Sequence, residues 1–433
     1  MTPVAWLVSN PYAPGTTGAS AQLDNIEQFQ LSNGMMGTAG GLSIVTEQMS
    51  IPWGMMSRFS YETTRGFVEV KLGMKDEAQP AIVPLFSGVL DEWEWNPASG
   101  RMTLVCRDRG ALLQERSVSA RVFAPNTTVS DAVTSIATSA GLRLASAVSI
   151  LDGNRQPIRM GTFYRGNNYF VANPEPAWGL LLHLAKKTNS VIYFLPTGEL
   201  YFGLRNRWTL LGHKVPTLSW STVGRSDFLS LRITHTPFRH GSFVQVVTSH
   251  DRKNGTAVHG TAAYIGPSVS LDAAGGSPIV PEVIKESGGT VVQVPAVPDL
   301  AGIEVGSTVP ELQATYGPMP VYSQNEASLA PDECSIAALS HAQQLAAQEV
   351  VLSAGVMGSE FYFTPGAAFY VQGTGDPQVD GELFIVAHVM SHFSVKDRGF
   401  VQELECWRED RQVIGIDFVG PNTDYTATKG PGS

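Results

Sequence analysis

Charged side chains are scarce in this sequence of 433 residues. Only 16% of its residues are Asp, Glu, Lys or Arg, compared with about 25% in a typical soluble chain. With so little charge to cover its surface, we expect other chains to cover part of it. The 29 basic residues are outnumbered by 39 acidic ones, which gives a formal net charge of -10. This balance argues against wrapping of nucleic acid, which needs a face of Lys and Arg, but it suits a wall that nucleic acid passes without sticking.

Cysteines and long apolar runs are also few. Cys106, Cys334 and Cys406 are odd in number and contain no CxxC pair, which predicts buried thiols in a reducing compartment. The apolar stretches, such as residues 178–185, are far shorter than the roughly 20 residues that span a bilayer. No basic residue precedes Arg58, so we expect no secretory signal. Synthesis in the cytoplasm and the absence of a membrane partner follow as expectations.

Two stretches far apart in the sequence have the same character. Residues 67–111 and 359–407 each alternate apolar and polar residues in short runs broken by Gly and Pro. Such alternation predicts β-strands, and closing short strands into a barrel removes the edges that a flat sheet exposes. Neither stretch contains a convergent set of catalytic side chains. A chain that forms two similar sheets without an active site is more typical of an assembly component than of an enzyme.

The length exceeds one ordinary core, so we expect two to four domains. The predicted fold class is mainly β, of the α+β type, with two β-barrel domains separated by an α+β domain and an irregular insertion in the second barrel. The predicted boundaries are 1–24 for an N-terminal arm or first edge strand, 25–117 for the first barrel, 118–222 for the α+β domain, 223–260 with 345–410 for the split second barrel, 261–344 for the insertion lobe and an Ala-rich helix, and 411–433 for a C-terminal tail.

Local patterns place the main elements. Helical spacing of apolar residues, with Thr127 or Thr128 as the cap and Gly141 at the end, predicts the first helix of the α+β domain. The other predicted elements are helices at 177–188 and 331–350, a hairpin at 191–203, and strands at 228–235 and 243–249 that pair with the strands of 359–407 in one sheet.

Residues 388–392 read HVMSH and superficially resemble the zinc-binding HExxH helix of metalloproteases. Position 389 is Val rather than the Glu that serves as base, and the surrounding apolar residues favour a strand. His388 and His392 would then lie roughly 13 Å apart, which is too far for one metal ion. We predict a strand here and no metal site.

Acidic and aromatic residues alternate in DEWEWN, residues 91–96. Glycosidases use paired carboxylates, so Asp91 or Glu94 would be the acid of a glycan hydrolase, and Trp93 and Trp95 would stack on sugar in a glycan-binding module. Strand alternation predicts one face made of Val89, Asp91, Trp93 and Trp95 and an opposite face made of Glu92 and Glu94. We favour a barrel wall with aromatic side chains inside and acids in solvent.

Arg107, Asp108 and Arg109 form a charge cluster at the end of the first β region. Three interpretations stay open: Asp108 braces both guanidinium groups, one Arg reaches a neighbouring subunit, or the cluster is simply solvated. Elsewhere the sequence lacks a GxSxG elbow, a GxxxxGK[ST] loop and a GxGxxG that follows a strand. We therefore assign no catalytic, cofactor-binding or metal-ligating residue and predict no cofactor.

The order of these segments resembles that of the baseplate hub proteins of contractile-tail bacteriophages, the late control gene D family, and the hub half of type VI secretion spike proteins. The resemblance covers about residues 60–255 and 335–408. The segments that carry it are PLFSGVLDEWEWNPASGRMTLVCRDRGALL from Pro84, TTVSDAVTSIATSAGL from Thr127, and HVMSHFSVKDRGF from His388.

The resemblance implies a structural protein of the phage baseplate in the virion tail. Each chain would supply two tube-like β-barrel domains, so that a homotrimer forms a ring of pseudo-sixfold symmetry that adapts the sixfold tail tube to the threefold central spike. The implied partners are two further copies of the chain, the tail tube protein and a separate spike protein, with a tape-measure protein and the baseplate wedge as further candidates. DNA would pass through the lumen without specific binding. The alternative from a different class is the cell-wall glycan hydrolase or glycan-binding tail module described above.

Overall fold

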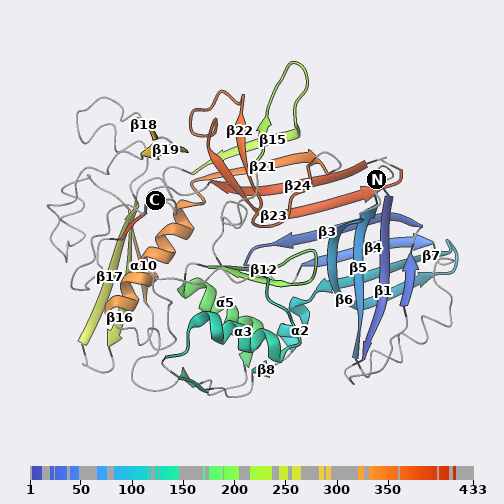
Figure 1. The fold of residues 1–433 in the computed structure, drawn as a ribbon, viewed down its shortest axis with the longest axis horizontal. Helices are drawn as coiled ribbons and strands as arrows, with labels where there is room; N and C mark the ends of the chain where they lie inside the picture. The colour runs from blue at the N-terminus through green and yellow to red at the C-terminus, as the bar shows by residue number, and fades with distance from the viewer. Residues whose placement is uncertain are drawn as a thin grey trace.

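The computed structural model describes residues 2–11, 20–23, 25–36, 40–47, 66–75, 82–115, 117–118, 122–124, 126–145, 169–170, 175–188, 190–203, 215–236, 243–251, 256–264, 282–286, 289–293, 320–325, 331–358, 361–396, 399–408 and 413–415. Its main feature is a sheet of 13 strands (Figure 1). The chain is mainly β, as predicted. No described helix is both long and apolar enough to cross a membrane.

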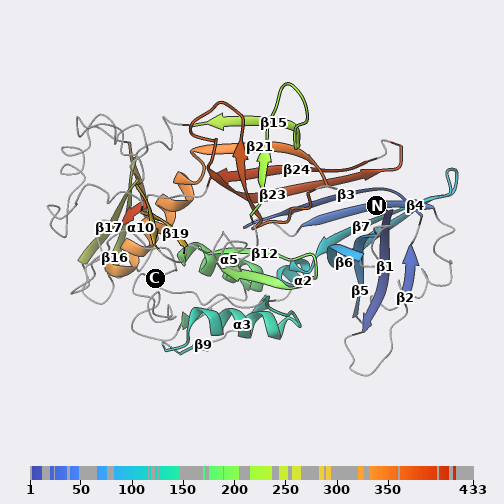
Figure 2. The same cartoon turned by 45° about the horizontal axis from the view of Figure 1, so that its top comes forward.

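The strands of this sheet come from two distant parts of the chain. The early strands are β1 (Thr2–Pro11), β2 (Ser20–Leu23), β3 (Ile26–Gly34), β4 (Gly41–Glu47), β5 (Gly66–Lys75), β6 (Ile82–Asn96) and β7 (Arg101–Asp108). The late strands are β14 (Thr217–Ser219), β15 (Phe228–His235), β21 (Val350–Met357), β22 (Ala368–Gln372), β23 (Leu383–Ser394) and β24 (Gly399–Arg408). Figures 1 and 2 show the early strands in blue to teal and, above them, β15 in yellow-green and β21 to β24 in orange and red.

Five early and five late strands have the same order in the sheet. The early repeat, β3 to β7, is arranged β3-β4-β7-β6-β5, and the late repeat, β15 with β21 to β24, is arranged β15-β21-β24-β23-β22. Every neighbouring pair in both repeats is antiparallel. In both repeats the first, second, fifth, fourth and third strands along the chain follow one another across the sheet. The two repeats therefore share one topology.

The match extends to the β-bulges. A bulge between Ile26 and Gln28 in β3 corresponds to one between Phe228 and Ser230 in β15. A second bulge, between Leu90 and Glu92 in β6, lies opposite Cys106, and its counterpart in β23 lies opposite Cys406. A bulge inserts one residue and fixes the register around it. The repeats therefore correspond residue by residue across four strands: the cross-strand row Phe29, Ile44, Leu104 and Trp93 matches the row Leu231, Ala354, Leu404 and Val389.

Each repeat surrounds its own apolar core. The early core includes Leu72, Leu90 and Leu104, and the late core includes Phe369, Val386 and Leu404. The strands β1 and β2 belong to the early core as well, because Leu7 and Leu23 are fully buried in it. The expected N-terminal arm is thus two strands of the sheet, in which β1 lies between β5 and β2. Of these two strands, only β2 lies at the end of the sheet, where an edge strand was the alternative prediction.

The α+β unit lies below the sheet in Figure 1. Its elements are α2 (Gly110–Glu115), β8 (Ser117–Val118), β9 (Val122–Phe123), α3 (Val129–Ser139), β10 (Tyr169–Phe170), β11 (Glu175–Pro176), α5 (Ala177–Lys187), β12 (Val191–Phe194) and β13 (Leu200–Gly203). Thr128 caps α3 by accepting a 3.0 Å hydrogen bond from the backbone N–H of Asp131, and Gly141 has the predicted left-handed conformation. The predicted helices and hairpin are confirmed.

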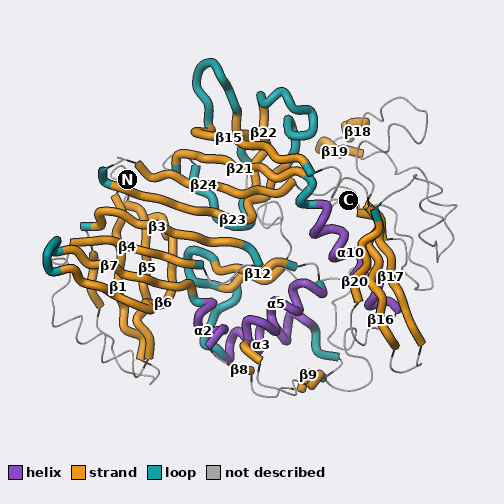
Figure 3. The backbone as a smooth tube through the Cα atoms, turned by 180° about the vertical axis from the view of Figure 1, so that it is seen from behind, coloured by secondary structure: helices purple, strands orange, loops and turns teal. Residues whose placement is uncertain are grey.

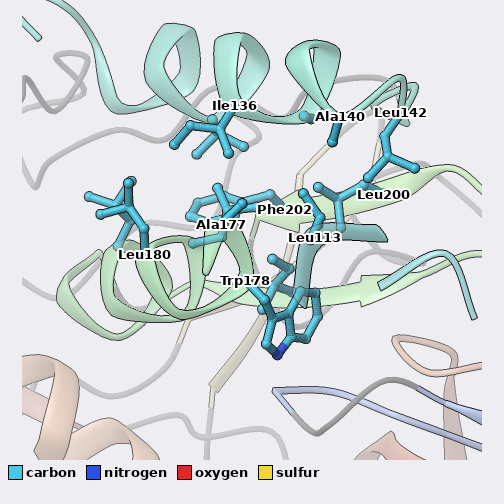
Figure 4. Packing of buried hydrophobic residues seen from close by; sticks show 14 of the residues in the cluster. Leu113, Ile136, Ala140, Leu142, Ala177, Trp178, Leu180, Leu200 and Phe202 are labelled. Carbon is cyan, nitrogen blue, oxygen red and sulfur yellow. The ribbon is translucent and has the colours of Figure 1, made fainter. Parts of the chain in front are cut away.

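Figure 4 shows how this unit is held together. Ile136 of α3 faces Leu180 of α5, and Leu200 and Phe202 of β13 fill the space between the helices, all of them buried. Burying side chains of this size stabilises the folded state by about 1.5–3 kcal/mol each. The unit therefore has a core of its own beside the two repeats.

The prediction that residues 243–249 complete the second β region is wrong. β16 (Phe243–Asp251) belongs to a separate sheet of order β20-β16-β17-β25, together with β17 (Thr256–Tyr264), β20 (Val321–Asn325) and β25 (Val413–Gly415). The Ala-rich helix α10 (Pro331–Ala346) packs on this sheet, where Ala338 and Ala342 belong to the same buried cluster as Phe243. The small side chains let the helix approach closely and cover the apolar face of β16. Of the two strands predicted to join the late repeat, β15 and β16, only β15 does so.

The insertion contains one further described hairpin, β18 (Glu282–Glu286) with β19 (Gly289–Gln293). Residues 265–281, 287–288 and 294–319 of the predicted insertion, and the tail after 415, lie outside the described residues. The domain boundaries themselves stay a prediction.

Candidate functional site

The HVMSH segment lies on a strand, as predicted. His388 and His392 are both part of β23, and His388 Nε2 lies 2.9 Å from the hydroxyl oxygen of Ser32 on β3. Within the described ranges no group of three or more His, Cys, Asp or Glu side chains is arranged to hold a metal ion. His388 therefore takes part in a contact between β23 and β3.

The bulge in β6 changes the predicted facing of the DEWEWN run. Val89 packs into the core of the α+β unit, whereas Trp93 packs against the early core on the other side of the sheet. Our prediction that Val89 and Trp93 share a face is wrong, because the extra residue Asp91 inverts the alternation. Trp93 and Trp95 are half-buried and Glu92 and Glu94 are exposed, so the aromatics face inward and these two acids face solvent, as we favoured.

The three charged residues at the end of β7, Arg107 to Arg109, make contacts with different partners. Arg107 forms a bidentate ion pair with Asp91, at 2.6 and 2.8 Å, and a 2.7 Å bond to Glu115. Arg109 pairs with the buried Glu69 of β5, which also accepts a 2.8 Å hydrogen bond from Ser87. Asp108 bonds to neither guanidinium group, so the bracing interpretation is wrong.

Asp108 instead holds the backbone at the end of β7. Its carboxylate accepts hydrogen bonds of 2.6 Å from the N–H of Gly40 and 2.7 Å from the N–H of Gly110. Burial raises the pKa of Asp108 to about 7, although the two N–H groups and nearby Arg107 lower it. For Glu69, burial alone would raise the pKa, but Arg109, Ser87 and Lys71 together lower it below its usual value.

The raised pKa of Asp108 predicts a pH-dependent stability. A carboxyl whose folded pKa lies above its unfolded value near 3.8 stabilises the fold below that value and loses the contribution as pH rises toward 7. The unfolding free energy of the wild type should therefore fall, relative to the non-titrating Asp108→Asn variant, by about 2 kcal/mol between pH 5 and 7. Urea unfolding at several pH values measures this difference, and a difference that stays constant with pH would contradict it.

The α+β unit contacts the hydrogen-bond network formed by Glu69, Ser87 and Arg109. Gly198, in the turn of the β12–β13 hairpin, has a φ of +83°, and a Cβ atom there would lie 2.6 Å from Ser87 Oγ and 2.8 Å from Arg109 Nε. Only a glycine fits this close approach. The tip of the hairpin therefore rests on the buried Glu69 network of the early repeat.

The cysteines are buried free thiols, as predicted. Burial raises the pKa of Cys106 and Cys406 well above the usual range. Both side chains therefore stay protonated, and a thiol is far less reactive than a thiolate. Cys106 and Cys406 occupy equivalent positions in the two repeats, and each lies opposite a bulge in the neighbouring strand. Packing accounts for both.

The seam between the repeats is the feature that sequence reasoning missed. β3 pairs with the second half of β23 in antiparallel register, from Gly34 opposite His388 to Gln28 opposite Ser394, and Figure 3 shows the two strands side by side. On one face of the seam, Phe29 stacks on Phe393 with ring centroids 5.7 Å apart, and Phe400 lies 5.9 Å from Phe29.

The other face of the seam is polar. It carries the contact between Ser32 and His388 and a bond from Gln30 to the sulfur of Met390. At the end of β3, the N–H of Met35 donates to Ala387 and that of Met36 donates to Ile192 of β12, which adds the α+β unit to the junction. This arrangement joins structural units edge to edge and presents no convergent acid, base or nucleophile.

No family model and no curated protein sequence matches this chain, but solved structures do. A tail protein from Neisseria meningitidis MC58 has a TM-score of 0.56 at 14% identity, over 94% of this chain and 97% of that one. The 43 kDa tail protein of prophage MuSo2 from Shewanella oneidensis has a TM-score of 0.54 at 10% identity, over 96% and 100%.

A chain of the Francisella PdpA-VgrG complex has a TM-score of 0.51 at 8% identity, with 98% of this chain covering 60% of that one. These likenesses extend over nearly the whole of this chain. The chain therefore has the fold of these tail and VgrG-complex proteins.

Proposed function

We propose that the chain is a structural tail hub, a homotrimer whose pseudo-sixfold ring adapts a sixfold tail tube to a threefold central spike in a phage baseplate. The observation that carries this proposal is the repeated strand topology within one chain. A chain with two equivalent β units needs only three copies to present six similar wall segments. The fold shared with two tail proteins supports the same assignment.

The rest of the chain supplies the threefold features. Each copy has one α+β unit and one α10-covered sheet, both outside the repeated strands (Figure 2). A ring of three chains therefore presents six similar edges to the tube and three unlike lobes to the spike. The low charge content suits a surface that other chains cover, and the net charge of -10 suits a lumen that DNA crosses without binding.

The proposal predicts the mass of the protein in solution. Size-exclusion chromatography with light scattering should give about three times the 46.5 kDa of one chain. The measurement should run from micromolar to tens of micromolar chain concentration, because a trimer dissociates on dilution. A mass of one chain over that whole range would contradict the proposal.

A further inference from the structure

The repeat predicts where one copy of the chain meets the next. Within one chain, the seam joins β3 of the early repeat to β23 of the late repeat. The late counterpart of β3 is β15, and the early counterpart of β23 is β6. We propose that β15 of one copy pairs with the second half of β6 in the next copy, as an antiparallel ladder that repeats the seam between chains. This inference rests on the proposed trimeric hub.

Both strands have the shape that this pairing needs. β23 pairs with β22 only through its first residues, Leu383 to Ile385, and uses its second half for the seam. β6 is built in the same way, because β5 pairs with it from Ile82 to Val89 and no described strand adds to that side beyond Val89. β15 has β21 as its neighbour on one side, and on its other side the described part of the chain places no strand.

The bulges fix the register of the proposed ladder. Counting from the bulges, Ser32 corresponds to Thr234, and Met390 corresponds to Glu94. Ser32 and Met390 are directly opposite in the seam, so Thr234 of one copy should lie opposite Glu94 of the next. The same count places Ile233 opposite Trp95 and Arg232 opposite Asn96.

The side chains at these positions are complementary. On the polar face of the seam, the hydroxyl of Ser32 meets His388; the corresponding residues are Thr234 and Glu92, again a hydroxyl and an acceptor. Arg232 is exposed in the single chain and would lie diagonal to Glu94, a distance at which opposite charges interact. On the other face, half-buried Ile233 would pack beside Trp95 and extend the apolar contacts.

The proposed ladder also removes open edges from the sheet. With it, a wall passes through β3, β4, β7 and β6 of each early repeat and through β15, β21, β24 and β23 of each late repeat, and returns to its start after three copies. Edge strands are sites of unwanted association unless they are paired or blocked. A head-to-tail contact that closes a ring pairs the open side of β15 and the open second half of β6 in every copy.

Cysteine cross-linking tests the register directly. Residues opposite each other in an antiparallel pair have Cα atoms about 4.5–5.5 Å apart, within the about 4.4–6.8 Å that a disulfide spans. We expect the Glu94→Cys/Thr234→Cys variant to form a covalent trimer on oxidation, seen by non-reducing electrophoresis. The shifted pair Glu94→Cys/Ile233→Cys should remain uncross-linked, because its side chains lie on opposite faces.

The seam provides the matched control. Ser32→Cys/Met390→Cys should close within one chain, with loss of free thiols and no gain in mass. If light scattering shows a trimer and this control closes but the Glu94/Thr234 pair does not, the proposed ladder is wrong while the trimeric hub stands. If the control closes and every variant has the mass of one chain, the trimeric hub itself is wrong.

Discussion

Replacing Arg408 with Ala should lower the unfolding free energy by about 3–5 kcal/mol, the usual cost of removing one partner from a buried ion pair. Arg408, the last residue of β24, forms an ion pair with Glu349, which directly precedes β21. Their side chains are only 11% and 6% exposed. The variant leaves the Glu349 carboxylate buried without this guanidinium group.

Glu349 lies at a junction, which is why the effect should spread. Its N–H bonds to Ala346 at the end of α10, and its carbonyl accepts from the N–H of Thr236 just after β15. The pair therefore joins the first and last strands of the late repeat to the helix that covers the separate sheet. We expect a lower urea midpoint and faster hydrogen exchange in β15 and β21.

Two controls separate this effect from a general loss of packing. The double variant Glu349→Gln/Arg408→Gln removes both charges and should lose much less stability than Arg408→Ala, since no buried charge remains unpaired. The exposed Lys396→Ala, in the turn after β23, should change stability by less than about 0.5 kcal/mol. An Arg408→Ala variant as stable as Lys396→Ala would contradict the account.

Replacing Phe29 with Ala should cost about 3–5 kcal/mol and loosen the seam between the repeats. Phe29 is 3% exposed in the early core, and its ring stacks on Phe393 at the end of β23. The change removes apolar burial and an aromatic contact that joins the two repeats. We expect unfolding to split into two transitions, because the repeats keep separate cores.

A double-mutant cycle with Phe393 isolates the contribution of the seam. Phe29→Ala and Phe393→Ala should be non-additive by about 0.5–1.5 kcal/mol, the range measured for aromatic pairs. Phe29→Leu serves as the milder control, because it keeps most of the apolar volume. Strict additivity, or one unchanged cooperative transition in Phe29→Ala, would show that the ring contact does not couple the repeats.

The sequence identified strands and helices well because their periods are local properties. The hairpin across Gly198 and the capped helix after Thr128 are as predicted. Partners of strands are non-local, so alternation could not reveal that β16 pairs with β20 rather than with the late repeat. For the same reason it could not show that residues 2–11 form an inner strand, β1.

The sequence did not predict which face of the sheet each side chain of β6 lies on, because β6 contains one extra residue at a bulge. Alternation holds only while the register is regular, and the bulge at Asp91 moves Trp93 to the opposite side of the sheet from Val89. Nothing in the letters DEWEWN marks a bulge. Asp108 shows a similar limit, because charge spacing suggested guanidinium partners while its carboxylate binds backbone N–H groups.

The repeat itself was visible only in outline. Two similar β regions were predicted, yet their equivalent strands share few letters, and the connection between the first two strands differs greatly. Residues 35–40 join β3 to β4, whereas β16, β17 and α10 lie between β15 and β21. Matching bulges opposite Cys106 and Cys406 reveal the residue correspondence once the pairings are known.

Rotational symmetry of the assembled particle tests the central claim most directly. Electron cryo-microscopy of the purified protein should show a ring of three chains whose inner wall has six similar segments, with the early and late repeats superimposing after a rotation of one sixth of a turn. Three outer lobes should break that symmetry. A twofold particle, or a threefold one whose early and late repeats occupy unrelated positions in the wall, would contradict the account.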